Sequence, residues 1–252
     1  MQIKLNGLVV SERKVKESNK LIYILTPDGI INCFVNCPKS NKSSKMAATQ
    51  LFSYSNFVIY KGKENNVVDE VNLNEFFLGL RKDIIKLSLA QYLCDLAIAL
   101  VPEYGDAMAF LRLMLNSLFY ISEDKKDLAL VKSIVELKMI SLAGYMPNVT
   151  GCNKCGRLEK NFMYFYPRRG ELYCEKCLIN DRKNERNLKV SEGVLSAMHH
   201  IIYSDLEKVY AFRISDSGKK ELSNLTEAYI KEQLGRTFKT LEFYHQICNF
   251  SN

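Results

Sequence analysis

Two Cys-x-x-Cys pairs, CNKC (152–155) and CEKC (174–177), lie 18 residues apart in the chain. Four cysteines seldom fall into this pattern by chance, and two such knuckles complete the tetrahedral sulfur shell that zinc favours. Gly156 follows the first pair directly and suits the tight turn of a knuckle. The segment therefore predicts a small ribbon around one structural zinc ion, held by Cys152, Cys155, Cys174 and Cys177.

Other chemistry at the four sulfurs has less support. A catalytic zinc keeps an open coordination position and usually has a His or carboxylate ligand. All three histidines of the chain, His199, His200 and His245, lie outside the cysteine pairs. Four thiolates also suit iron, and a dithiol redox pair would leave the second Cys-x-x-Cys without a role. Iron and redox chemistry are therefore alternatives to structural zinc.

The compartment follows from the absence of an export or membrane signal. Residues 1–16 contain no apolar leader, and the most apolar run, LAIALV (96–101), is too short to span a bilayer. We expect a cytoplasmic protein without a membrane partner, whose thiols stay reduced. The remaining cysteines are then expected to be small buried hydrophobic residues, at Cys33, Cys37, Cys94 and Cys248.

The first 75 residues predict a small β-barrel. Short runs of alternating apolar residues indicate strands at 2–10, 20–26, 29–36, 51–60 and 66–71. Pro27-Asp28-Gly29 predicts a hairpin turn between the second and third strands, because Pro presets φ and Gly tolerates a positive φ. Five short strands with one long polar loop suit an OB-fold.

The rest of the chain predicts a helical domain that the cysteine ribbon interrupts. Apolar residues recur at helical spacing over about 85–100, 105–121, 125–143, 191–204 and 220–249. The fold class is therefore α+β and multidomain. We expect an OB-fold at 1–75, a first helical part at 76–150, the ribbon insertion at 151–180 and a second helical part at 181–252.

The net charge of +7 is unevenly distributed. Residues 1–63 carry 10 Lys and Arg against 3 Asp and Glu, residues 64–151 carry 8 against 12, and residues 152–190 carry 10 against 5. Two basic segments that flank an acidic one suggest a polyanionic partner. The loop CPKSNKSSK (37–45) and the Arg168-Arg169 turn are the candidate contacts, and ordinary solvated turns are the alternative for both.

The order of these parts resembles the RecO family of bacterial recombinational DNA-repair mediators. The resemblance covers almost the whole chain, through GLVVSERK (7–14), LIYILTPDGI (21–30), LFSYSNFVIYKGK (51–63), SLAQYLCDLA (88–97), GYMPNVTGCNKCG (144–156) and QLGRTFKTLEFY (233–244). It implies an N-terminal OB-fold, a helical domain and an inserted four-cysteine zinc ribbon. The sequence departs from the family in the loop after the third strand. The family commonly has Ala-Lys-Gly-Ala-Arg there, and this chain has Val35-Asn36-Cys37-Pro38-Lys39, so the early lysine is missing while later ones remain.

The resemblance implies a nucleoid-associated, non-catalytic mediator of DNA repair and recombination. Such proteins bind single- and double-stranded DNA, anneal complementary strands and help to load RecA, together with RecR and the single-stranded-DNA-binding protein. The residues expected to contact DNA are basic: Arg13, Lys14, Lys16, Lys39, Lys42, Lys45, Lys61, Lys63, Arg168 and Arg169. The alternatives are a zinc-ribbon adaptor or regulator without a direct DNA function, and a metal-dependent enzyme. No phosphate-binding loop, nucleophile elbow or metal-carboxylate motif supports the enzyme.

Overall fold

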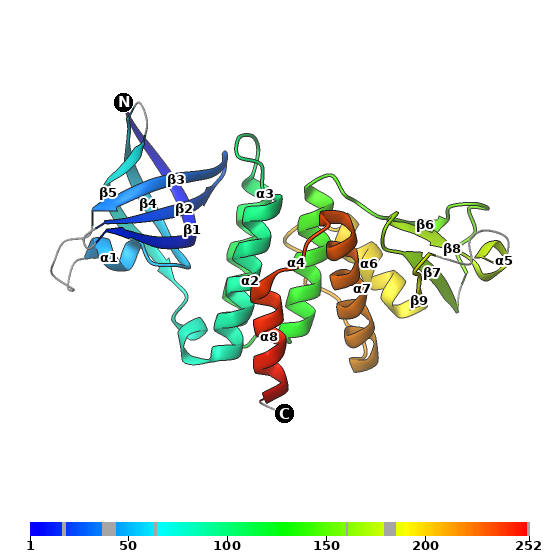
Figure 1. Ribbon diagram of the computed structural model, residues 1–252. Coiled ribbons are helices and arrows are strands. Elements are labelled where there is room, and N and C mark those ends of the chain that lie inside the picture. The colour runs from blue at the N-terminus through cyan, green and yellow to red at the C-terminus, as the bar shows by residue number, and fades with distance from the viewer. Residues whose placement is uncertain (17–18, 37–43, 63–64, 160, 179–184, 251–252) are drawn as a thin grey trace. The chain divides into compact units, whose positions relative to one another are not determined.

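The fold is described from a computed structural model of the chain (Figure 1). The structure describes residues 1–16, 19–36, 44–62, 65–159, 161–178 and 185–250. Its contacts form two compact units, Met1–Lys125 with Lys239–Asn252, and Lys126–Phe238. These units divide the chain more coarsely than the four predicted domains, whose boundaries stay a prediction.

Five strands near the N-terminus form a closed barrel, as the sequence predicts (Figure 1). They are β1 (Gln2–Lys16), β2 (Asn19–Thr26), β3 (Gly29–Asn36), β4 (Ser53–Lys61) and β5 (Asn66–Phe76). Their order is β1-β2-β3-β5-β4, and β1 also pairs with β4, so that the sheet has no open edge. A parallel contact between β3 and β5 at Phe34 and Val67 completes the arrangement expected of an OB-fold.

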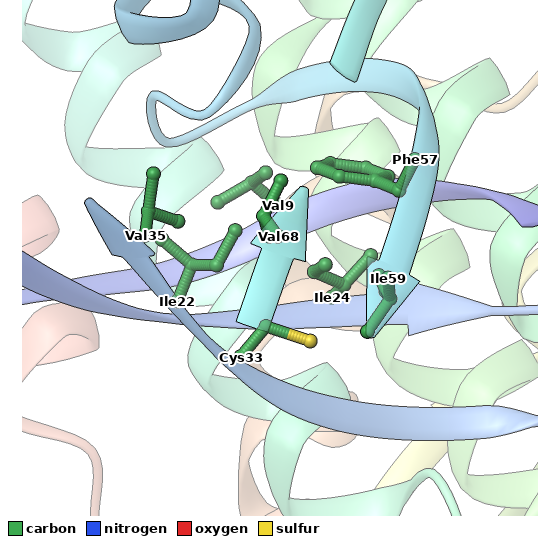
Figure 2. Close-up of a cluster of buried hydrophobic side chains, with 8 residues drawn as sticks. All are labelled: Val9, Ile22, Ile24, Cys33, Val35, Phe57, Ile59 and Val68. Atoms are coloured by element: carbon green, nitrogen blue, oxygen red, sulfur yellow. The ribbon is translucent and has the colours of Figure 1, made fainter. Parts of the chain in front are cut away.

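The barrel core contains side chains from all five strands (Figure 2). Alternate residues point inward because successive side chains of a strand lie on opposite faces. The inward set is Val9, Ile22, Ile24, Cys33, Val35, Phe57, Ile59 and Val68. Burial raises the pKa of the Cys33 thiol to about 12, although Lys61 opposes that shift, so Cys33 is an inert core residue as expected. Cys94 is also buried, whereas Cys248 is only half-buried, and Cys37 lies outside the described residues.

The predicted hairpin turn between β2 and β3 is present and is held against the segment after α2 (Ile84–Leu100). Gly29 has a φ of +117°, and a Cβ at this position would lie 2.4 Å from the carbonyl oxygen of Glu103. The amides of Gly105 and Ala107 donate to the carbonyl oxygens of Asp28 and Pro27, at 3.2 and 2.7 Å. The turn therefore needs glycine both for its backbone angle and for the close approach.

Besides the short α1 (Ser44–Ala48), the described part of the first unit has three longer helices. They are α2, α3 (Met108–Ser122) and α8 (Lys239–Phe250), and a short 3₁₀ turn, η1 (Leu78–Lys82), precedes them. Asp83 begins α2 by accepting a hydrogen bond from the amide of Ile85 at 2.7 Å. The Thr240 hydroxyl of α8 donates to Asp95 of α2 at 2.8 Å, which joins residues that are far apart in sequence. Among the described residues, every helix is too short or too polar to cross a bilayer.

The second unit combines three longer helices with a small sheet. The helices are α4 (Leu128–Leu142), α6 (Glu192–Tyr203) and α7 (Asp216–Leu234). The sheet has the order β6-β8-β7-β9, made of β6 (Asn148–Cys152), β7 (Phe162–Tyr166), β8 (Glu171–Tyr173) and β9 (Leu188–Ser191). The short helix α5 (Glu175–Leu178) follows β8. Strands β6, β7 and β8 overlap the ribbon predicted at 151–180, whereas β9 lies beyond it, and the whole sheet lies between α4 and α6 in the sequence.

The single helix predicted over 220–249 is wrong. The chain forms two helices instead, and Gly235 ends α7 in the left-handed conformation with a φ of +60°. Its amide donates to the carbonyl oxygen of Lys231, which is a common way for a helix to stop. The second helix, α8, belongs to the first unit, while α7 belongs to the second.

Candidate metal centre and nucleic-acid surface

The four sulfurs of the two Cys-x-x-Cys pairs lie together. The Sγ atoms of Cys152, Cys155, Cys174 and Cys177 are all within 4.8 Å of one another, and those of Cys155 and Cys174 are 3.8 Å apart. A zinc ion with tetrahedral sulfur ligands at about 2.3 Å requires sulfur separations of about 3.8 Å. The cluster can therefore hold one metal ion, with four thiolates that leave no open position.

Backbone geometry brings the first pair into position. The amide of Gly156 donates to the Cys152 carbonyl oxygen and the amide of Cys152 donates to that of Arg157, both at 2.8 Å. Gly156 has a φ of +73°, as the tight turn requires. Burial raises the pKa of Cys152, but backbone donors at Cys174, Cys155 and Lys154 outweigh it and lower that pKa to about 6. A thiolate, which is the form that ligates metal, is thus favoured at this position.

One predicted DNA residue, Arg13, lies on the outer face of the barrel. Ile22 and Cys33 point into the core, so Leu21 and Phe34 point outward. The strand register places Arg13 opposite Leu21 and Leu21 opposite Phe34. Arg13 is exposed and therefore shares a continuous outer row with Phe34.

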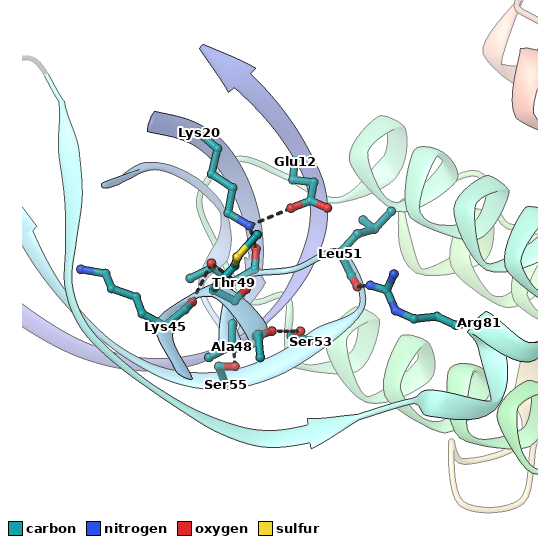
Figure 3. Close-up of polar contacts among 11 residues, drawn as sticks. Glu12, Lys20, Lys45, Ala48, Thr49, Leu51, Ser53, Ser55 and Arg81 are labelled. Carbon is teal, nitrogen blue, oxygen red and sulfur yellow. Dashed lines mark hydrogen bonds and ion pairs between the residues drawn. The ribbon is translucent and has the colours of Figure 1, made fainter. Parts of the chain in front are cut away.

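Lys14, the neighbour of Arg13, lies on the other face of β1. It pairs with Lys20, whose ammonium group is 2.8 Å from Glu12 and 2.7 Å from the carbonyl oxygen of Thr49 (Figure 3). Lys14 is exposed. Arg13 and Lys14, which were both predicted to contact DNA, thus lie on opposite faces of β1. Lys16 ends β1, and its side chain, like Lys39, Lys42 and Lys63, lies outside the described residues.

Lys45 has a structural role that the sequence did not suggest. It lies on the short helix α1 (Ser44–Ala48), and its Nζ donates to the carbonyl oxygens of Val68 and Asp69, both at 2.9 Å. The ammonium group therefore fastens α1 to β5. A DNA contact by Lys45 stays a prediction, and it would compete with these two hydrogen bonds.

The other predicted basic residues lie in two places. Lys61 is exposed at the end of β4 and borders a hollow of about 400 Å³, whose walls include Tyr23, Asn32 and Tyr104. In the ribbon, Arg168 and Arg169 are both exposed. The guanidinium of Arg169 forms a 2.7 Å ion pair with Glu185, so that its charge is already matched.

The outer face of the barrel carries aromatic residues that were not among the predicted site residues. Tyr23 and Phe34 point outward from β2 and β3, and Tyr60, which is 53% exposed, lies on β4. Tyr60 pairs with Val67, and Val67 pairs with Phe34, so these side chains follow one another around the barrel. The signal was available, because each ring alternates with a core residue.

Comparison with known proteins decides the family. The family model described as Recombination protein O N terminal matches residues 1–77, and the one described as Recombination protein O C terminal matches residues 81–242. The chain belongs to the RecO family. The similar RecO family proteins include the DNA repair protein RecO of Acetivibrio thermocellus, 33% identical over 96% of this chain and 95% of that protein.

Further RecO relatives match over similar lengths. The DNA repair protein RecO of Alkaliphilus metalliredigens is 28% identical over 98% of this chain and all of that protein. That of Symbiobacterium thermophilum is 28% identical over 94% of both chains. Since the match includes both the barrel and the ribbon, this RecO family member is a DNA repair protein of the recombination class.

Proposed function

We propose that this RecO family member is a non-catalytic mediator that binds single- and double-stranded DNA and anneals complementary strands. The observation that carries the proposal is the outer row of the barrel. Arg13, Phe34 and Tyr60 lie on the outer face of β1, β3 and β4, with Leu21 and Val67 between them in the strand register, and there a basic residue can meet phosphate and rings can stack on bases. This combination suits a strand of any sequence, because every base has a ring face and every nucleotide a phosphate.

The mechanism depends on charge. Two complementary strands repel each other through their phosphates, and basic side chains that neutralise the phosphates reduce that repulsion. We assign this role to the basic residues of the barrel, chiefly Arg13 and Lys61. Arg168 of the ribbon is a further candidate. Lys39, Lys42 and Lys63 remain part of the proposal as residues outside the described ranges.

Zinc is proposed as the ion of the four-cysteine cluster. A shell of four thiolates is typical of a structural site, and zinc would fix the ends of β6 and β8 rather than act on a substrate. Cys152, Cys155, Cys174 and Cys177 would be its ligands. Loss of the ion is expected to unfold the ribbon locally, because metal binding and folding are coupled in such sites.

The partners of the proposal are proteins of the recombination reaction. We propose that the protein acts with RecR and the single-stranded-DNA-binding protein, and through them helps RecA to load on DNA in the nucleoid. This part rests on membership of the family and on the resemblance along the chain. A zinc-ribbon adaptor that binds protein partners without DNA is the alternative.

A titration of the full chain against fluorescent single-stranded DNA of mixed sequence, at several salt concentrations, tests the proposal. Annealing of complementary strands is followed in the same samples. We expect binding that ignores sequence and weakens steeply with salt, together with faster annealing. Absence of binding at low salt would refute the mediator and favour the adaptor.

A further inference from the structure

The ribbon sheet carries an aromatic face of its own. Met163, Phe165, Leu172 and Val190 are fully buried on one face of the sheet. Their neighbours Phe162, Tyr164 and Tyr173 alternate with them and lie on the opposite face, where each is half-buried, while Tyr166 of the same face is buried against Tyr173 with ring centroids 5.2 Å apart. Tyr164 and Tyr173 are direct cross-strand partners on β7 and β8, the two central strands.

A cation lies beside these rings. Lys189 of β9 pairs with Tyr164, and its Nζ is 3.7 Å from the centroid of the Phe162 ring. The Phe162 and Tyr164 rings are in edge contact, with centroids 5.7 Å apart. Three aromatic residues and one exposed lysine thus occupy neighbouring positions on three adjacent strands.

Tyr173 directly precedes the ligand Cys174, whereas Phe162 and Tyr164 lie on a strand that carries no ligand. The cysteines stand at the end of β6, just after β8 and on α5, whereas Phe162 and Tyr164 belong to β7. The Tyr173 hydroxyl donates to Glu171 at 2.8 Å, which fixes the edge of that ring. Rings held in place on the central strands of a sheet form a platform on which unpaired bases can stack.

We propose that this aromatic face is a second nucleic-acid site, where one or two bases of a single strand stack on Tyr164 and Tyr173, while Phe162 holds Lys189 beside them. Lys189 would meet a phosphate of the same strand. The segment 152–190 carries 10 Lys and Arg against 5 Asp and Glu, which matches a polyanionic occupant. A single strand is favoured over a duplex, because only unstacked bases can lie on protein rings.

The inference rests on the proposed DNA-binding function but concerns the other unit of the chain. The barrel surface and the ribbon surface are separate proposals, and each can fail alone. Removal of a stacking ring from a single-strand site weakens binding by about fivefold or more. The Tyr164→Ala variant should show such a loss for oligothymidylate, whereas Tyr203→Ala, which truncates a 50% exposed ring of α6, should not.

The chain contains no tryptophan, so one introduced tryptophan reports on one site. The Tyr164→Trp variant of the full chain, loaded with one zinc ion, is titrated with oligothymidylate and with a hairpin duplex of equal length. Tyr203→Trp serves as the matched control. Anisotropy of labelled DNA is recorded in parallel, and zinc content shows that the ribbon remains folded.

We expect oligothymidylate to quench the fluorescence of Tyr164→Trp strongly, the duplex to quench it weakly, and Tyr203→Trp to respond to neither. If anisotropy shows binding while Tyr164→Trp is not quenched, or is quenched equally by the duplex, the ribbon site is refuted and the barrel proposal stands. If anisotropy shows no binding of any DNA, the proposed function fails and the ribbon site with it.

Discussion

Lys132 and Glu136 lie one turn apart on α4 and form a buried 2.9 Å ion pair, with 1% and 0% of their side chains exposed. Two groups of α7 join them: Glu227 is 2.7 Å from the Lys132 ammonium, and the Thr226 hydroxyl donates to Glu136 at 2.6 Å. The contact between α4 and α7 is therefore made of charges as well as apolar side chains, and each charge has a partner.

Replacement of Lys132 by Met should destabilise the second unit by about 3–5 kcal/mol, because it leaves the Glu136 carboxylate buried without its ammonium partner. Urea unfolding of the full chain measures the loss, and hydrogen exchange of α4 and α7 locates it. Lys220→Met, at an exposed position of α7, is the control and should change stability by less than about 0.5 kcal/mol. Equal losses in the free energy of unfolding would show that the buried ion pair stabilises the unit no more than an exposed lysine does.

Gly29→Ala should destabilise the first unit more than Gly105→Ala does. Both glycines have a positive φ, +117° and +130°, so both variants carry backbone strain of about 1–3 kcal/mol. Only at Gly29 would the new Cβ meet backbone, the Glu103 carbonyl oxygen at 2.4 Å, while at Gly105 it meets nothing within 4 Å. Thermal unfolding of the two variants compares them, and equal losses would mean that the turn moves freely away from Glu103.

Cys152→Ser should abolish stoichiometric metal, while Cys248→Ser should retain it. Cys152 supplies one of the four clustered sulfurs, and Cys248 lies on α8. Metal content after purification, and the sulfur-to-cobalt absorption of cobalt-substituted protein, measure the difference.

Metal affinity should fall as the pH falls, because thiolates must be free of protons to bind and the metal-free state therefore holds more protons. An affinity that does not change with pH would contradict thiolate ligation.

Arg13→Gln should weaken DNA binding and lower the salt slope by about one, because one phosphate contact is lost. Lys14→Gln is its matched control, since Lys14 is also exposed but lies on the other face of β1. DNA titrations at several salt concentrations give both quantities. If Lys14→Gln has the larger effect, the outer row of the barrel is not the DNA surface.

Local patterns predicted the elements well, because alternation and helical spacing act within a few residues. The five strands, the Gly29 turn and the helices over 84–142 follow from such patterns. Long-range partners could not be predicted in this way. The bonds of Lys45 to β5 and of Thr240 to Asp95 join segments whose meeting depends on the whole fold.

The functional residues show the same limit. The spacing of the cysteines predicts their cluster, because each Cys-x-x-Cys pair brings its two sulfurs together within four residues. In contrast, the alternation that buries Cys33 in the core turns Phe34, which is half-buried, to the outer face, and its row with Arg13 becomes visible only when the neighbouring strands are placed beside it. Lys132 and Glu136 resemble a surface pair in the sequence, and only the packing of α7 buries them.

The position of α8 has a consequence for synthesis on the ribosome. This helix belongs to the first unit, yet all of Lys126–Phe238 is translated before it. Domains generally fold as the chain emerges, N-terminal first. The barrel can form early. The contact between α2 and α8, including the hydrogen bond from Thr240 to Asp95, can form only after Thr240 has emerged. The unit that starts first is therefore the last to be finished.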